Sequence, residues 1–152
     1  MCIRDSVDEL RLGEAILLGC KPLHRQAIEG LRTDAFTLVA EVIEVKEKPA
    51  QPWGERAQGA FGETATRPGS GTIRQAIVAL GRQDVDPEGI APSDGVVMLG
   101  MSSDHLVVDL GEVEASVGDE LAFGLDYSAL VRAATSPFVS RREFSPRRSL
   151  RV

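Results

Sequence analysis

The most regular segment of the chain reads Phe36-Thr37-Leu38-Val39-Ala40-Glu41-Val42-Ile43-Glu44-Val45-Lys46. Apolar residues occupy nearly every second position from Phe36 to Val42, and Ile43 and Val45 follow. A period of two is typical of a strand that buries one face, and β-branched residues favour the same structure. The segment therefore predicts a β-strand over 36–46.

Several shorter segments towards the C-terminus resemble this one and are separated by Gly and Pro. They predict strands at Thr72–Leu80, Val96–Leu99, His105–Leu110, Glu120–Leu125 and, last, Pro137–Val139. Apolar residues at helical spacing predict short helices at Glu14–Gly19 and Tyr127–Ala134, whereas 48–71 reads as a long loop and 84–94 as turn-rich. Many short strands with few helices indicate a mainly β fold, a barrel or a sandwich.

The composition excludes several classes of protein. The chain has 152 residues, 43% of them hydrophobic, which suits one domain or one domain with the edge of another. A net charge of -6 argues against a nucleic-acid binder, and we expect the basic residues of 141–152 to form a solvated tail. Two cysteines and two histidines predict neither a disulfide framework nor a metal site.

Targeting signals are also not expected. No apolar run approaches the roughly 20 residues that span a bilayer, and the N-terminus lacks the apolar segment of a signal peptide. We therefore expect a cytoplasmic protein that does not contact membranes. Residues 1–6 resemble translated library-adapter sequence, to which we assign no function, and a genuine start peptide is the alternative.

The first candidate site is Arg11-Leu12-Gly13-Glu14, where a glycine precedes a predicted short helix. Amides at a helix N-terminus favour a phosphate, although a single glycine at this place is more often only a turn. The second is Gly81-Arg82-Gln83-Asp84-Val85-Asp86, a charged segment directly after a strand. Loops at strand ends often bind ligands, and a solvated loop is the plainer interpretation.

The third candidate is Ser102-Ser103-Asp104-His105. A catalytic triad is not expected here, because neighbours on a strand point to opposite faces and Asp104 could not then orient His105. No nucleophile elbow is present either. A tight turn that brings Asp104 to a ligand is the better interpretation. Tyr127, the only tyrosine, would by itself suggest core packing.

The order of these segments resembles a known family. The segments are Leu10-Arg11-Leu12-Gly13-Glu14-Ala15-Ile16-Leu17-Leu18-Gly19, Asp34-Ala35-Phe36-Thr37-Leu38, the 81–86 segment, Leu99-Gly100-Met101-Ser102-Ser103-Asp104-His105-Leu106 and Thr135-Ser136-Pro137-Phe138-Val139. Together they resemble the C-terminal part of fold-type III pyridoxal-phosphate-dependent amino-acid racemases, specifically the ornithine-racemase-like branch of the alanine racemase family. The combination is specific, although no single motif is.

This resemblance implies a division of the chain. Residues 7–20 would end a TIM-like barrel that holds pyridoxal phosphate, with its last strand at the N-terminus of the chain. Residues 21–140 would form the C-terminal β-barrel or sandwich-like domain that closes over the active site in a homodimer. The cofactor lysine would lie upstream, so that the chain alone is expected to be inactive as an isomerase.

The resemblance also implies roles for individual residues. Arg11 would face the pyridine nitrogen of the cofactor, to which a guanidinium donates without releasing its proton. Backbone amides of Gly13 and Glu14, with the Tyr127 hydroxyl, would hold the phosphate. Ser103 and Asp104 would lie near the carboxylate of a small-molecule amino acid.

One position departs from the pattern of alanine racemases. They place a catalytic tyrosine directly after the glycine, where this chain has Arg82. Racemisation needs an acid or base on each face of the planar intermediate, and a guanidinium is a poor base. Asp84, Asp104 or a residue outside the chain could serve, which leaves the second group open.

The substrate and the reaction also remain open at this level. The Gly-Arg-Gln-Asp string points away from alanine, and Arg82, Asp84 and Asp86 are candidate substrate-binding residues. We hypothesise that Asp84 or Asp86 pairs with the side-chain ammonium of ornithine or a similar basic amino acid. The alternatives are a decarboxylase or aldolase that uses the same cofactor, and a β-rich domain that binds a partner without catalysis.

Overall fold

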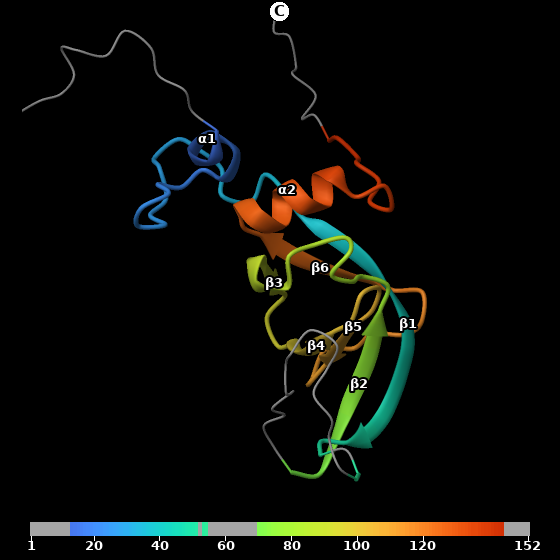
Figure 1. The fold of residues 1–152 in the computed structure, drawn as a ribbon. Helices are drawn as coiled ribbons and strands as arrows, with labels where there is room; N and C mark the ends of the chain where they lie inside the picture. Colours follow the sequence, from blue (N-terminus) through green and yellow to red (C-terminus); the bar gives the residue numbers. More distant parts are fainter. Residues whose placement is uncertain (1–12, 52, 55–69, 145–152) are drawn as a thin grey trace, which may run out of the picture.

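The computed structural model describes residues 13–51, 53–54 and 70–144. Their elements, in chain order, are α1 (Glu14–Leu18), β1 (Leu38–Pro49), β2 (Thr72–Val78), the 3-10 helix η2 (Pro87–Gly89), β3 (Ile90–Pro92), β4 (Val97–Met101), β5 (Leu106–Asp109), β6 (Glu120–Leu125) and α2 (Tyr127–Thr135). The strands form one antiparallel sheet in the order β3-β6-β1-β2-β5-β4. The sheet curls into a nearly closed barrel, with α2 at one end (Figure 1). The prediction of a mainly β, barrel-like domain is confirmed.

The long strand β1 joins the two halves of this sheet. Its first residues, Leu38–Glu41, pair with β6, and Val42–Pro49 pair with β2. The register shifts between Val42 and Glu44, and such a bulge bends a strand and increases its twist. The predicted strand is therefore confirmed, although it begins at Leu38 and continues to Pro49.

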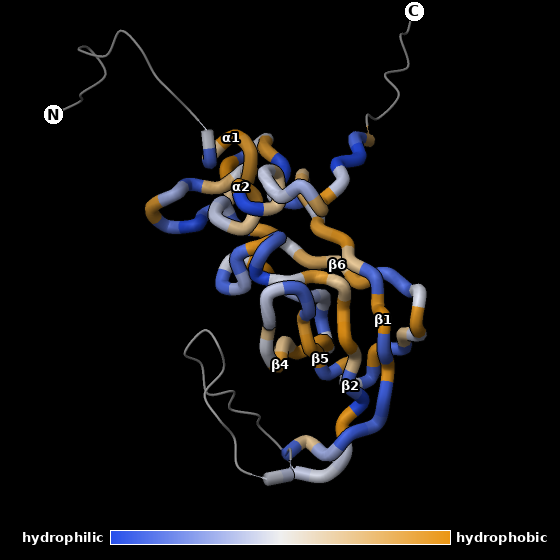
Figure 2. Tube along the Cα trace, turned by 45° about the vertical axis from the view of Figure 1, so that its right-hand side comes forward, coloured by the Kyte–Doolittle hydropathy of each residue, from blue (hydrophilic) through white to orange (hydrophobic). Residues whose placement is uncertain are grey.

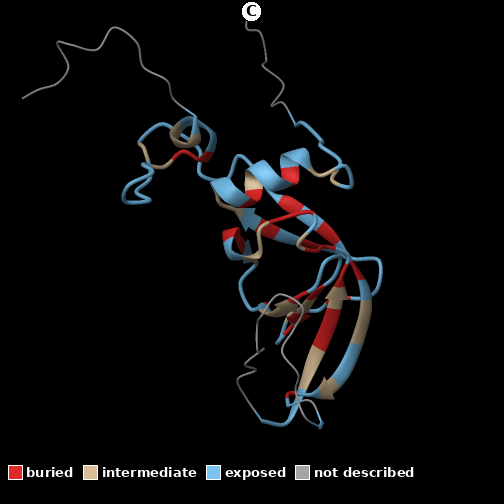
Figure 3. Ribbon diagram, in the orientation of Figure 1, coloured by how far each residue is buried: buried red, intermediate tan, exposed pale blue. Residues whose placement is uncertain are grey.

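The core lies inside the curled sheet. Its largest fully buried side chains are Phe123, Leu106, Leu110, Val42, Val78, Val85 and Val108. Figure 2 shows apolar residues along β1, β5 and β6, and Figure 3 shows that buried positions gather in the strands. Each such side chain contributes about 1.5–3 kcal/mol by leaving water. Ala129 and Ala133 pack α2 onto this core.

Two segments differ from expectation. The turn-rich region 84–94 contains η2 and the short strand β3, which pairs with β6 from Ile90 to Pro92. Pro137–Val139 was predicted to be a strand, and this is wrong: Pro137 and Phe138 form a turn after α2, and no strand of the described residues pairs with this segment.

Two regions remain partly untested. Most of the predicted 48–71 loop and most of the basic tail lie outside the described residues. Within the described ranges, no helix is long and apolar enough to cross a bilayer.

Candidate functional site

The strand register brings the second and third candidate segments together. Val78 at the end of β2 pairs with Leu106 at the start of β5, and Leu106 pairs with Met101 at the end of β4. The C-terminal ends of β2 and β4 therefore lie at the same end of the sheet. There the amide of Arg82 donates to the carbonyl of Ser102 at 3.0 Å.

Gly81 makes this contact close. The Gln83 amide also donates to the Ser103 carbonyl, at 2.9 Å. A Cβ atom on Gly81 would lie 2.1 Å from the Ser103 carbonyl oxygen and 2.3 Å from the Asp104 Cα. Both obstacles are backbone atoms, so only glycine allows the two loops to meet. The structure thus places Arg82 beside Ser103 and Asp104.

Residues 102–105 form a tight turn between β4 and β5, as expected. The Ser102 amide donates to the His105 carbonyl at 2.8 Å. The Asp104 carboxylate accepts hydrogen bonds from the hydroxyls of Ser103 at 3.0 Å and Ser102 at 3.2 Å. The Ser103 hydroxyl, with a smaller contribution from the nearby His105, lowers the pKa of Asp104. An exposed, ionised carboxylate therefore projects from this turn.

The expectation that Asp104 and His105 diverge is wrong. The Nδ1 atom of His105 lies 3.3 Å from Oδ1 of Asp104, because β5 begins only at Leu106 and both residues belong to the turn. A Ser-His-Asp triad is still not formed, because the hydroxyls of Ser102 and Ser103 donate to Asp104 and not to the imidazole ring.

Asp84 and Asp86 differ in their surroundings. Asp84 is 7% exposed, and its carboxylate accepts from the Gly81 amide at 3.1 Å and the Ser136 hydroxyl at 3.0 Å. Asp86 caps η2 through the Glu88 amide at 3.3 Å and accepts from the Ser128 hydroxyl at 2.5 Å. The Ser128 hydrogen bond lowers the pKa of Asp86, so this side chain is a carboxylate at neutral pH.

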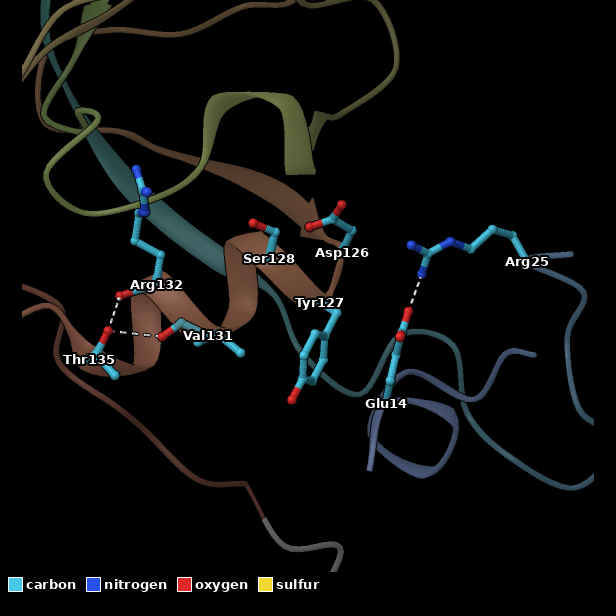
Figure 4. Close-up of a pocket in the computed structure, with 8 residues that line it drawn as sticks. All are labelled: Glu14, Arg25, Asp126, Tyr127, Ser128, Val131, Arg132 and Thr135. Carbon is cyan, nitrogen blue, oxygen red and sulfur yellow. Dashed lines mark hydrogen bonds and ion pairs between the residues drawn. The ribbon is translucent and has the colours of Figure 1, made fainter. Parts of the chain in front are cut away.

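Glu14, from the first candidate segment, lies at a second place, beside α2. Glu14, Arg25, Tyr127 and Val131 line an open pocket of about 570 Å³, together with Asp126, Ser128, Arg132 and Thr135. Figure 4 shows the Tyr127 ring between α2 and Glu14, which is paired with Arg25. The structure therefore brings Glu14 and Tyr127, predicted from distant segments, to one pocket.

Capping explains where the pocket residues stand. Oδ1 of Asp126 accepts from the Ala129 amide at 2.9 Å, so α2 begins at Tyr127 and projects this side chain from its first turn. Gly13 is the N-cap of α1, and a Cβ atom at this position would meet no described atom within 4 Å. Arg11, the fourth predicted cofactor residue, lies outside the described residues.

The pocket offers donors suited to a phosphate. Tyr127 is 41% exposed, and within the described part of the chain its hydroxyl has no hydrogen-bond partner. The amides of Gly13 and Glu14 at the start of α1 have no acceptor among the described residues, whereas the Ile16 amide donates to the Gly13 carbonyl at 3.0 Å. Arg25 and Arg132 add positive charge, although Arg25 also neutralises Glu14. These two arginines were not predicted, because neither stands in a motif and only folding brings them to the pocket.

The chain is similar in sequence to known proteins. No protein-family model matches the chain. It is 43% identical over 141 residues to a lysine racemase of Thermotoga maritima, and this alignment covers 91% of the chain and 40% of the relative. It is 37% identical over 140 residues to an ornithine racemase of Acetoanaerobium sticklandii, which covers 90% of the chain and again 40% of the relative. The chain thus spans 40% of the length of these curated relatives, and over that span its sequence is similar to theirs.

Proposed function

We propose that the chain is the β-rich part of a racemase that interconverts the L and D forms of a basic amino acid. The observation that carries the proposal is the match, over nine tenths of the chain, to proteins named for lysine and ornithine. The arginine that follows Gly81 supports a substrate other than alanine, because alanine racemases have a tyrosine there.

Pyridoxal phosphate is the proposed cofactor. When bound, it supplies the electron sink that lets a proton leave and return at Cα of the amino acid. The hydroxyl of Tyr127 and the amides of Gly13 and Glu14 would donate to its phosphate in the α2 pocket. The supporting geometry is the convergence of Glu14 and Tyr127 on that pocket.

Asp104 is a better candidate than Asp84 for the second proton-transfer group. Both oxygens of Asp84 accept intramolecular hydrogen bonds in a buried position, which is the pattern of a turn-forming carboxylate. Asp104 is exposed in the turn beside Arg82 and Ser103, where a substrate could reach it. Asp86 is proposed to face the substrate ammonium, because its lowered pKa keeps it ionised.

Exposed apolar side chains support a domain that packs on further protein. Ile16 and Leu17 of α1 are 54% and 41% exposed, and Phe138 beyond α2 is 73% exposed. Apolar residues grouped at one end of a domain commonly mark an interaction surface. We propose that this end meets the cofactor-binding part of a homodimeric, cytoplasmic enzyme.

A chimaera tests the proposal. The matching segment of the Thermotoga maritima lysine racemase is replaced by this chain, and turnover of L-lysine, L-ornithine and L-alanine is followed by chiral chromatography. We expect D-lysine or D-ornithine, with less D-alanine.

The controls are the unmodified relative and the same chimaera carrying Asp104→Asn, which should lose most activity. A folded chimaera that binds cofactor yet releases CO2 would support a decarboxylase, and one that binds no cofactor would support a partner-binding domain.

A further inference from the structure

Two rows of side chains run along α2 and its C-cap. Tyr127, Val131 and Thr135 stand four residues apart and line the pocket shared with Glu14. Ser128, Arg132 and Ser136 stand four residues apart on the adjacent row. Residues at this spacing share one side of a helix. The second row defines what we name the α2 ladder: Ser128, Arg132 and Ser136.

Every member of the α2 ladder contacts the 81–86 loop. The Ser128 hydroxyl donates to Asp86 at 2.5 Å, and Nη1 of Arg132 donates to the Arg82 carbonyl at 3.3 Å. The Ser136 hydroxyl donates to Asp84 at 3.0 Å. Eight residues of helix span about 12 Å, so the loop is held along the whole length of α2.

The far side of the same loop contacts the 102–105 turn. Gly81 packs on the backbone of Ser103 and Asp104, and the Arg82 and Gln83 amides donate to that turn. Contacts therefore continue from the α2 pocket through the ladder and the loop to Asp104. Moving the loop relative to α2 would change the distance between the pocket and the turn.

We infer that Ser128, Arg132 and Ser136 are positioning residues, which set the loop bearing Arg82 and Asp86 relative to the pocket bearing Tyr127. This inference rests on the proposed function, in which the pocket binds the cofactor and the 81–86 loop binds the substrate. Productive geometry tolerates little displacement: an error of about 1 Å can cost up to about 100-fold in rate. The ladder should therefore affect substrate turnover through the loop, and loss of Ser136, which does not line the pocket, should do so with cofactor affinity unchanged.

The first experiment uses the 152-residue chain and needs no catalysis. Ser136→Ala removes the partner of a buried carboxylate, and Ser128→Ala removes the partner of Asp86. We expect amide hydrogen exchange at residues 82–85 to become about tenfold faster, as for loss of one hydrogen bond to a charged group. Ser136→Thr, which keeps the hydroxyl, should restore slow exchange.

Ser93→Ala is the matched control. It deletes a serine hydroxyl that donates to one backbone carbonyl, that of Ala122, at 3.0 Å outside the ladder. Its exchange at 82–85 should equal that of the parent chain. Unchanged exchange in both Ser136→Ala and Ser128→Ala would overturn the ladder itself.

The second experiment uses the full-length enzyme. Ser136→Ala, which lies outside the pocket lining, should lower kcat/KM for the basic amino acid about tenfold, with the dissociation constant of pyridoxal phosphate unchanged. Faster exchange with unchanged kcat/KM would overturn the positioning role. If the full-length parent enzyme racemises nothing, the proposed function fails, and the exchange experiment still decides whether the ladder holds the loop.

Discussion

Replacement of Gly81 by alanine should separate the two loops that carry Arg82 and Asp104. The added methyl group would lie 2.1 Å from the Ser103 carbonyl oxygen, and 2.3 Å from both the amide nitrogen and the Cα of Asp104. All three atoms belong to the backbone, so no side-chain rotation relieves the overlap. The loops must move apart by at least about 1 Å before ordinary contact distances return.

The cost follows from what this movement breaks. The hydrogen bonds of the Arg82 and Gln83 amides to the 102–105 turn, at 3.0 and 2.9 Å, would both be lost. Each contributes about 1 kcal/mol, and overpacking of a tight contact adds about 1–3 kcal/mol. We therefore expect the free energy of unfolding to fall by about 3–5 kcal/mol, a large share of the roughly 5–15 kcal/mol typical of a domain.

Urea denaturation of the 152-residue chain, followed by circular dichroism, measures this difference. The midpoint of Gly81→Ala should fall by about 2 M at an unchanged slope. Gly100→Ala is the control, because no atom lies within 4 Å of a Cβ at Gly100, in the neighbouring strand β4. Equal midpoints for Gly81→Ala and Gly100→Ala would refute the argument that close approach requires glycine at position 81.

Three further changes have expected outcomes. On the proposed function, Tyr127→Phe should weaken binding of pyridoxal phosphate to the full-length protein about tenfold, measured by fluorescence titration. An unchanged dissociation constant would show that the hydroxyl does not belong to the phosphate site. The hydrogen bond from Ser128 lowers the pKa of Asp86 in the folded state. The ionised Asp86 therefore stabilises the fold at pH values above its unfolded pKa of about 3.9, and this stabilisation is lost as the pH falls through the lower pKa of the folded state. Asp86→Asn should therefore reduce the urea midpoint at pH 7 but not at pH 2. An equal reduction of the midpoint at both pH values would contradict a role for the ionised carboxylate. Arg74 donates to the carbonyls of Val113 at 3.0 Å and Ala115 at 2.7 Å. Arg74→Met should therefore lower the free energy of unfolding by about 2–4 kcal/mol in the same assay. A decrease below about 1 kcal/mol would show that these two hydrogen bonds contribute little.

Local pattern was sufficient for the elements that are regular over several residues. The alternation in 36–46 identified β1, and helical spacing after Asp126 identified α2 within one residue of its end. β3 was missed because Pro92 and a nearby glycine suggest turns, and its strand structure depends on pairing with β6. Pro137–Val139 shows the converse case, since its apolar residues have no strand beside them to pair with.

The site was less predictable because its contacts join distant segments. The family resemblance named Gly81–Asp86 and Ser103–Asp104 separately, but their contact depends on the register that aligns Val78, Leu106 and Met101 across three strands. A slip of one residue would turn the side chains of a whole strand to the other face, and no local pattern reports such a slip. The four-residue spacing of Ser128, Arg132 and Ser136 is visible in the sequence, but only the structure shows that all three contact the 81–86 loop. Spacing thus predicts which side chains share a side of a helix, and the fold decides what that side does.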